Sequence, residues 1–129
     1  MGFVRCILIG MALAQTILAQ DTTGITGTWR GRSACEQKES ACKDETVVYR
    51  VTPVKDRPGS YTVDADRIVD GKALNMGMLE FRYLEQEHAL ICEYPQGVWR
   101  FSVGKEKMDG TLTRRDGSIF RRVTLAKDK

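Results

Sequence analysis

His88 is the only histidine of the 129-residue chain, so it is the only imidazole that could serve as the base of a Ser/His/Asp or Cys/His site. It follows Glu85 and Glu87 beside a predicted turn, where a solvated side chain is the usual outcome. Asp64 and Asp66 could form a carboxylate pair on one strand face, but that face is predicted to be solvated. The glycines are spaced as turns and form no nucleotide-binding motif. The sequence therefore predicts a protein that is not an enzyme and indicates no cofactor.

The first twenty residues, MGFVRCILIGMALAQTILAQ, have the pattern of a secretory leader, in which Arg5 precedes an apolar run that ends in small residues. We expect cleavage after Ala19, with Ala14 as the alternative, which makes 1-19 a signal peptide and 20-129 a single domain. The uncharged run is shorter than the roughly 18 apolar residues that span a bilayer, so no membrane span is expected. The expected location is the periplasm or the extracellular space.

Three cysteines remain after removal of the leader, and an oxidising compartment favours pairing two of them. Cys35 and Cys42 lie in the polar segment CEQKESACKDE, where a disulfide would close a short surface loop. Cys92 lies in the apolar run ALICEY and is predicted to be a buried free thiol. No metal site is predicted, because structural zinc usually takes four Cys or His ligands and the chain has no C-x-x-C pair.

Opposite charges are nearly balanced along the chain. Removing the leader takes away Arg5, and the formal charge falls from +3 to +2. Acidic residues are interspersed among the basic ones, which include Arg30, Arg32 and the pairs Arg114-Arg115 and Arg121-Arg122. This distribution is typical of solvated strand faces, and no nucleic-acid partner is expected.

Apolar and polar residues alternate beyond the leader, and turn residues interrupt them at short intervals, which is the pattern of β-strands. Asp70-Gly71 and Asp116-Gly117 predict two-residue hairpin turns. Gly77 predicts a bend or bulge in the longest strand. The eight predicted strands span 26-34, 45-54, 59-69, 72-84, 89-94, 98-103, 107-113 and 118-126.

Eight sequential antiparallel strands are expected to close into an up-and-down barrel, because closure removes two exposed edges. The predicted outer face carries Thr62, Asp64, Asp66, Glu80, Arg82, Arg100, Ser102, Asp109 and Thr113. The predicted core comprises Trp29, Tyr49 or Val48, Tyr61, Val63, Ala65, Leu79, Phe81, Tyr83, Leu90, Cys92, Trp99, Phe101, Val103, Met108, Gly110, Leu112, Ile119, Arg121, Val123 and Leu125, with Met76 and Met78 as further fillers of the interior.

The stretch GITGTW, residues 24-29, begins the first strand, and this G-x-W pattern resembles the calycins, which include lipocalins, fatty-acid-binding proteins and avidins. The chain is also similar to small exported bacterial domains of no assigned activity that share GTW, a cysteine-containing first loop and late GTL and FR patterns. The resemblance implies that Trp29 plugs the closed end and that a basic residue of the last strand packs across it. Arg121 is the in-phase candidate, with Arg122 or Lys127 as alternatives. Only Trp29 and Trp99 are present as tryptophans, so biotin is not predicted.

Two functions are compatible with such a barrel. The first is a binding module for a small apolar or amphipathic ligand, and the second is a packed barrel that presents its loops to a protein or envelope partner. Both use the end opposite Trp29, where residues 35-44, 70-71, 95-97 and 114-117 are expected to cluster. The predicted ligand contacts are Trp29, Phe81, Tyr83, Trp99, Phe101 and Arg121.

Overall fold

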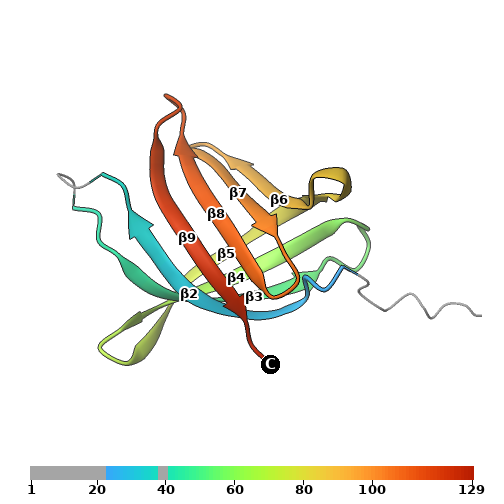
Figure 1. Ribbon diagram of the computed structural model, residues 1–129, viewed down its shortest axis with the longest axis horizontal. Helices are drawn as coiled ribbons and strands as arrows, with labels where there is room; N and C mark the ends of the chain where they lie inside the picture. The colour runs from blue at the N-terminus through green and yellow to red at the C-terminus, as the bar shows by residue number, and fades with distance from the viewer. Residues whose placement is uncertain (1–22, 38–40) are drawn as a thin grey trace, which may run out of the picture.

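The computed structural model describes residues 23–37 and 41–129 and shows a closed antiparallel barrel in which each strand pairs with the next and β9 returns to β2 (Figure 1). The predicted eight-stranded up-and-down barrel is confirmed, and each strand agrees with its predicted range to within one residue at either end. The predicted leader and its cleavage site lie outside the described residues. The elements are β2 (Gly27–Cys35), β3 (Glu45–Pro53), β4 (Ser60–Val69), β5 (Lys72–Leu84), the 3-10 helix η2 (Glu85–Glu87), β6 (Ala89–Tyr94), β7 (Gly97–Val103), β8 (Lys107–Arg114) and β9 (Ile119–Lys127).

The first strand closes the barrel because it pairs on both sides. Trp29 of β2 lies opposite Tyr49 of β3 and opposite Lys127 of β9. Trp29 has no exposed surface, so the end of the barrel where β2 begins is closed. The connections β2–β3, β4–β5, β6–β7 and β8–β9 therefore lie at the other end, as predicted.

The interior is filled by inward-facing side chains of all eight strands. Phe101 is at its centre, stacked on Trp99 at 5.6 Å between ring centroids and edge-on to Tyr49 and Phe81. The buried cluster consists of Ile25, Trp29, Val47, Tyr49, Val51, Tyr61, Val63, Phe81, Leu90, Cys92, Phe101, Met108, Val123 and Leu125. This agrees with most of the predicted core and selects Tyr49 over Val48 as the interior residue of its strand.

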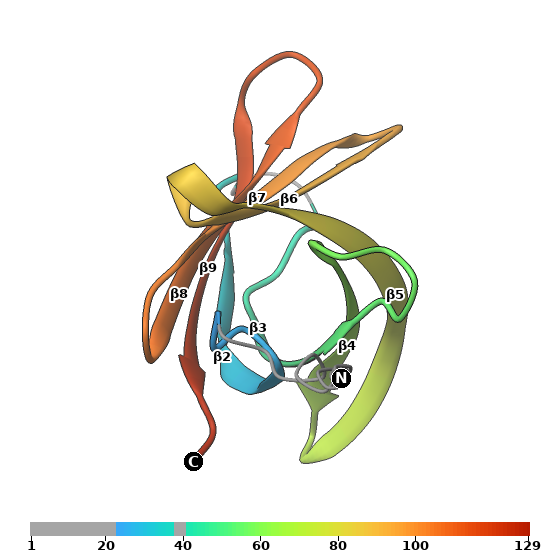
Figure 2. The ribbon, with the colours of Figure 1, turned by 90° about the vertical axis from the view of Figure 1, so that its right-hand side faces the viewer.

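Three residues of β5 are more exposed than the predicted core. Met76 and Met78 are 44% and 60% exposed, so the prediction that they fill the interior is wrong. Leu79 is 37% exposed but lines the interior cavity, as its predicted inward phase requires. The cause is the arrangement of the neighbouring strands, because β5 pairs with β6 only from Arg82 to Leu84 and diverges from it before that point (Figure 2). That part of β5 consequently has no opposing wall to cover it.

Two turns test the hairpin predictions. Asp70 and Gly71 both have positive φ, at 51° and 79°, which confirms a two-residue turn of the predicted kind. The turn at Asp116-Gly117 is not the predicted two-residue turn, because four residues separate Arg114 at the end of β8 from Ile119 at the start of β9. The carboxylate of Asp116 accepts hydrogen bonds from the backbone N–H and the hydroxyl of Ser118, which favours this wider loop.

A bulge in β5 confirms the prediction made from Gly77. The register with β4 shifts between Ala65 and Asp66, so that Met76 and Gly77 together oppose Ala65. Gly77 has a φ of 105°, a conformation that side chains with a Cβ rarely adopt. The bulge turns the end of the β4–β5 hairpin away from the rest of the barrel (Figure 1).

Candidate ligand-binding site at the open mouth of the barrel

A pocket of about 670 Å³ opens at the end of the barrel opposite Trp29. Tyr94 comes from the end of β6, Leu112 from β8 and Phe120 from the start of β9. The two neighbouring loops complete the rim. The lining residues are Tyr94, Pro95, Gln96, Leu112, Arg114, Arg115, Asp116 and Phe120.

Strand periodicity explains why most of these side chains face the pocket. Leu90 and Cys92 of β6 are buried, and Tyr94 continues the same face toward the rim. Met108 and Leu112 of β8 are buried in the same way, and Arg114 follows in phase. Tyr94 and Arg114 therefore continue the inner surface of the barrel toward its open end.

Phe120 reaches the pocket for a different reason. The register between β8 and β9 shifts between Leu112 and Thr113, whose partners are Arg121 and Ile119, so Phe120 is an extra residue in β9. Its ring lies under the guanidinium of Arg114, with 4.4 Å from Cζ to the ring centroid. The bulge thus adds an aromatic wall that strict alternation would not provide.

The charges around the pocket are mostly basic. Arg115 donates a hydrogen bond to the carbonyl of Pro95 at 3.1 Å. Hydrogen bonds from Ser118 lower the pKa of Asp116, which keeps this carboxylate ionised and engaged within its own loop. Arg114 contacts the ring of Phe120, and no carboxylate of the described residues lies within ion-pair distance of it. The charge of Arg114 helps to lower the pKa of Asp116, but the two groups form no ion-pair contact, so the guanidinium is placed to receive an anionic group.

The disulfide-closed loop stands beside this pocket. Cys35 and Cys42 are bonded, which confirms the predicted pair. Arg121 donates to the carbonyl of Lys43 at 3.0 Å and to the hydroxyl of Ser33 at 3.0 Å. The N–H of Glu36 donates to the carbonyl of Phe120. The loop is consequently anchored to the strand that supplies one wall of the pocket.

The six predicted ligand contacts lie apart from the mouth pocket. Phe81, Trp99 and Phe101 line a cavity of only about 50 Å³ in the interior, and Trp29 is buried at the closed end. Tyr83 packs edge-on against Tyr61, at 6.4 Å between ring centroids. Arg121 approaches the pocket through Phe120, at 5.7 Å from its ring centroid. A role for these six side chains in binding stays a prediction.

The residue that packs across Trp29 is Lys127, not Arg121. The ammonium of Lys127 lies 5.7 Å from the indole centroid, within the range of a cation–π contact. The β2–β9 register pairs Trp29 with Lys127 and places Arg121 opposite Cys35, at the other end of the barrel. The alternation of inward and outward residues does not tell which end of a strand a residue occupies. The first candidate, Arg121, was therefore wrong, and the alternative, Lys127, was right.

The sequence predicted the loops of the mouth but not its walls. Gln96, Arg114 and Arg115 lie in ranges that were expected at the open end, whereas Tyr94 and Phe120 were not predicted there. Extending the inward phase of β6 by one position would have found Tyr94. Phe120 is out of phase because of the bulge, so no strand pattern signals it.

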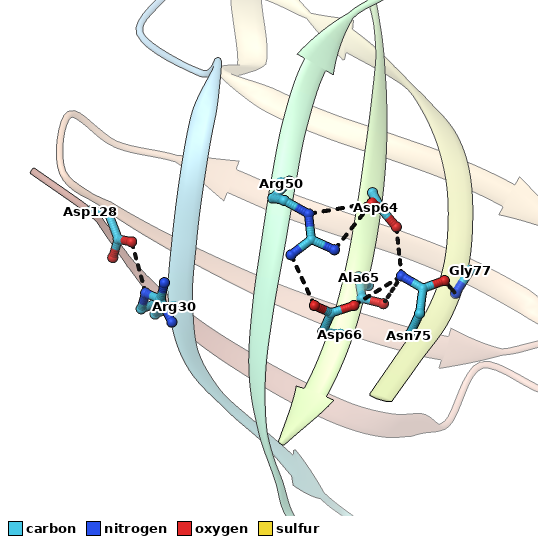
Figure 3. A network of polar contacts seen from close by, with 8 residues as sticks. All are labelled: Arg30, Arg50, Asp64, Ala65, Asp66, Asn75, Gly77 and Asp128. Atoms are coloured by element: carbon cyan, nitrogen blue, oxygen red, sulfur yellow. Dashed lines mark hydrogen bonds and ion pairs between the residues drawn. The ribbon is translucent and has the colours of Figure 1, made fainter. Parts of the chain in front are cut away.

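The outer-face carboxylates form a structural network (Figure 3). Arg50 donates to Asp64 at 3.1 Å and to Asp66 at 2.9 Å. The amide of Asn75 donates to both carboxylates at 2.8 and 2.9 Å and accepts the N–H of Gly77 at 3.0 Å. These contacts join β3, β4 and the bulge of β5, and they place both aspartates on the predicted solvated face.

The other residues with reactive side chains are placed as follows. His88 is exposed in the turn after η2, with its Nδ1 3.3 Å from the hydroxyl of Tyr83. Cys92 is a buried free thiol, as predicted, and burial raises its pKa.

Within residues 23–37 and 41–129, no group of three or more His, Cys, Asp and Glu is arranged to hold a metal ion. The same part of the chain contains no helix with the length and apolarity needed to cross a membrane.

The comparisons with known proteins bear on the fold. No protein-family model matches the chain, and no curated protein does. Seven solved chains match, and one of them is the siderocalin Ex-FABP, which is described as functioning through dual ligand specificities. That match covers 82% of this chain and 74% of the siderocalin, with a TM-score of 0.55 and 13% sequence identity. The chain therefore has a lipocalin-like fold, in agreement with the calycin resemblance of its G-x-W start.

Proposed function

We propose that the protein binds a small amphipathic molecule, with an apolar body and an anionic group, in the mouth pocket. The volume of about 670 Å³ is in the usual range for small-molecule sites. Tyr94, Leu112 and Phe120 offer apolar surface to the body of such a ligand. The lipocalin-like fold supports a binding role, because barrels of this size can hold one small ligand.

The position of Arg114 is the observation that carries the proposal. Its guanidinium is held over Phe120 and has no ion-pair partner among the described carboxylates. A cation fixed over an aromatic ring at the rim of an apolar pocket favours a ligand that enters body first and leaves its anionic group at the mouth.

Titration with dodecanoate and with dodecanol, followed by amide chemical shifts, tests this proposal. Both probes share the apolar chain, and only the first carries a negative charge. We expect shifts at Tyr94, Leu112 and Phe120 with both probes. Arg114→Ala should lower the affinity for dodecanoate about fivefold, which corresponds to the loss of about 1 kcal/mol for a partly exposed ion pair. The affinity for dodecanol should stay nearly unchanged.

Arg82→Ala is the matched control, because Arg82 is an exposed strand arginine that does not line the mouth pocket. It removes the same charge and should leave the affinity for both probes unchanged. An equal loss of affinity for dodecanoate in the two variants would indicate a general charge effect and contradict the proposed site. Shifts confined to Thr62, Asp64, Glu80, Arg82 and Arg100 on the outer face would contradict it as well.

A packed barrel that presents its open-end loops to a protein partner is the second candidate. The small interior cavity of about 50 Å³ and the anchored disulfide loop favour it. A disulfide-closed loop loses less entropy on binding than an open one, so the double variant Cys35→Ser, Cys42→Ser should weaken the binding of such a partner. Absence of any shift with either lipid probe would favour this candidate over the first.

We also propose that the chain is exported, with 1-19 removed and 20-129 as the working domain. The Cys35–Cys42 disulfide supports this location, because disulfides persist in oxidising compartments. Mass spectrometry of the protein isolated from its host should give a mature chain that begins at Gln20. A chain that retains Met1 would contradict the proposal.

A further inference from the structure

The stretch of β5 from Lys72 to Phe81, here called the β5 edge, has a strand neighbour on only one side within residues 23–37 and 41–129. It pairs with β4 along its whole length, whereas pairing with β6 begins only at Arg82. A pocket of about 300 Å³ opens at the point where β5 and β6 separate. The β4–β5 hairpin projects from the barrel beyond that point (Figure 1).

The backbone of the β5 edge offers hydrogen-bonding groups on its open side. The N–H of Tyr83 donates to the carbonyl of Gly59, so the backbone groups of Tyr83 face β4. Alternate residues of an antiparallel strand face the same neighbour, which directs the N–H and C=O of Met78 and Glu80 away from β4. No strand of the described residues pairs with them there. The β5 edge is therefore a template for one more strand.

Apolar side chains accompany this open edge. Met78 is 60% exposed, the highest value among the exposed large hydrophobic residues. The exposed large hydrophobic residues of the described chain all lie in the β4–β5 hairpin, and they are Val69, Leu74, Met76, Met78 and Leu79. A cluster of this kind on one element marks an interaction surface.

We propose that the β5 edge pairs with the β5 edge of a second copy of this chain, antiparallel and about a two-fold axis near Met76 and Gly77. The seven residues between Lys72 and Glu80, ALNMGML, carry no charge, so no like charges face each other across the middle of the pair. Lys72 lies at one end, and Glu80, which is paired with Arg57 of its own chain, lies near the other. The antiparallel arrangement keeps the two Lys72 side chains at opposite ends of the pair. A parallel pair would place like charges side by side.

The conformation of the edge is fixed before a partner binds, and its open backbone groups favour a strand over a lipid surface. The side chain of Asn75 binds Asp64, Asp66 and the N–H of Gly77, so the bulge is held in one conformation before pairing. The unpaired backbone groups of Met78 and Glu80 disfavour insertion into hydrocarbon, where they would lack partners. The inference is independent of the mouth pocket, whose walls belong to β6, β8 and β9.

Sedimentation equilibrium of the mature protein over a concentration series tests the proposal, combined with hydrogen exchange at the Met78 and Glu80 amides. We expect a monomer–dimer equilibrium, with slower exchange at both amides as the dimer forms. Met78→Lys places a charge in the middle of the edge and should raise the dimer dissociation constant at least about tenfold. Circular dichroism should show an unchanged fold.

Thr124→Lys is the matched control, because Thr124 is exposed on β9 and has strand neighbours on both sides. It should leave the dimer dissociation constant unchanged. A monomer at every concentration, equal weakening by both variants, or growth into species larger than the dimer would overturn the proposal. Binding of the monomer to phosphatidylglycerol vesicles through Met78 would assign the surface to lipid and overturn it as well.

Discussion

Lys127 lies directly opposite Trp29 in the β2–β9 register, with its ammonium 5.7 Å from the centroid of the indole ring. The same ammonium donates to the carbonyl of Gly24 at 2.6 Å, and the indole N–H donates to the carbonyl of Ile25 at 2.9 Å. Trp29 therefore has its ring covered and its polar atom satisfied. This arrangement seals one end of the barrel.

Replacing Trp29 with alanine should lower the free energy of unfolding by about 3 to 5 kcal/mol, the usual effect of deleting a buried large aromatic side chain. Urea denaturation measures this change. Lys127→Met, which removes the charge but keeps the aliphatic chain, should cost no more than about 1 kcal/mol. A change below about 1 kcal/mol for Trp29→Ala would show that the indole does not plug the barrel.

Gly110→Ala should destabilise the protein by about 1 to 3 kcal/mol, because the added methyl group would force the ring of Phe101 out of its packed position. A Cβ at Gly110 would lie 2.3 Å from Cδ2 of Phe101, whose ring is held between Trp99, Tyr49 and Phe81. Thermal or urea unfolding measures the effect.

Thr111→Ala, at the next position of the same strand, is the control and should change stability by less than about 0.5 kcal/mol. Combining Gly110→Ala with Phe101→Leu should cost less than the sum of the two single changes, since the smaller side chain makes room for the new methyl group. Additive costs would contradict the steric explanation.

Acid should weaken the network on the outer face. Hydrogen bonds from Asn75 and Arg50 lower the pKa of Asp64, and hydrogen bonds from Arg50 and Asn75 lower that of Asp66, from a usual value of 3.8. Each carboxyl binds its proton more weakly in the folded than in the unfolded chain. Their contribution to stability is therefore complete above pH 3.8 and is lost as the pH falls through the lower folded pKa.

The double variant Asp64→Asn, Asp66→Asn should accordingly lose less stability than the parent protein between about pH 5 and about pH 2. Urea unfolding at a series of pH values measures this slope. Asp109→Asn, on the exposed face of β8, serves as the control outside the network. A slope as steep in the double variant as in the parent would assign acid sensitivity to other carboxylates.

The mature chain should contain one thiol, and that thiol should be protected. Burial and the charge of Glu93 raise the pKa of Cys92, so little thiolate is present near neutral pH. A thiol reagent should react slowly with the folded protein and titrate one group in denaturant. Three reactive groups would contradict the Cys35–Cys42 disulfide, and fast reaction in the folded state would contradict the burial of Cys92.

Local patterns were sufficient to predict much of this architecture. Alternation placed Phe81, Phe101 and Val123 on the inner face, and Asp70-Gly71 predicted its turn, because strand periodicity and positive φ are properties of a few adjacent residues. The composition around Cys35 and Cys42 was likewise enough to predict their disulfide. The up-and-down barrel followed from the strand count and the need to close two edges, and the lipocalin-like fold was implied by the resemblance of GITGTW to calycins.

Tertiary structure decided the features that depend on contacts between distant strands. Met76 and Met78 have apolar side chains typical of core residues, yet they are exposed because β5 separates from β6. Phe120 enters the mouth pocket through a register shift that no alternation reveals. Lys127 covers Trp29 because pairing of the first strand with the last sets which end of β9 reaches the plug. Register and strand divergence arise from the closure of the whole barrel, so only the assembled barrel determines where its open edge and its binding pocket lie.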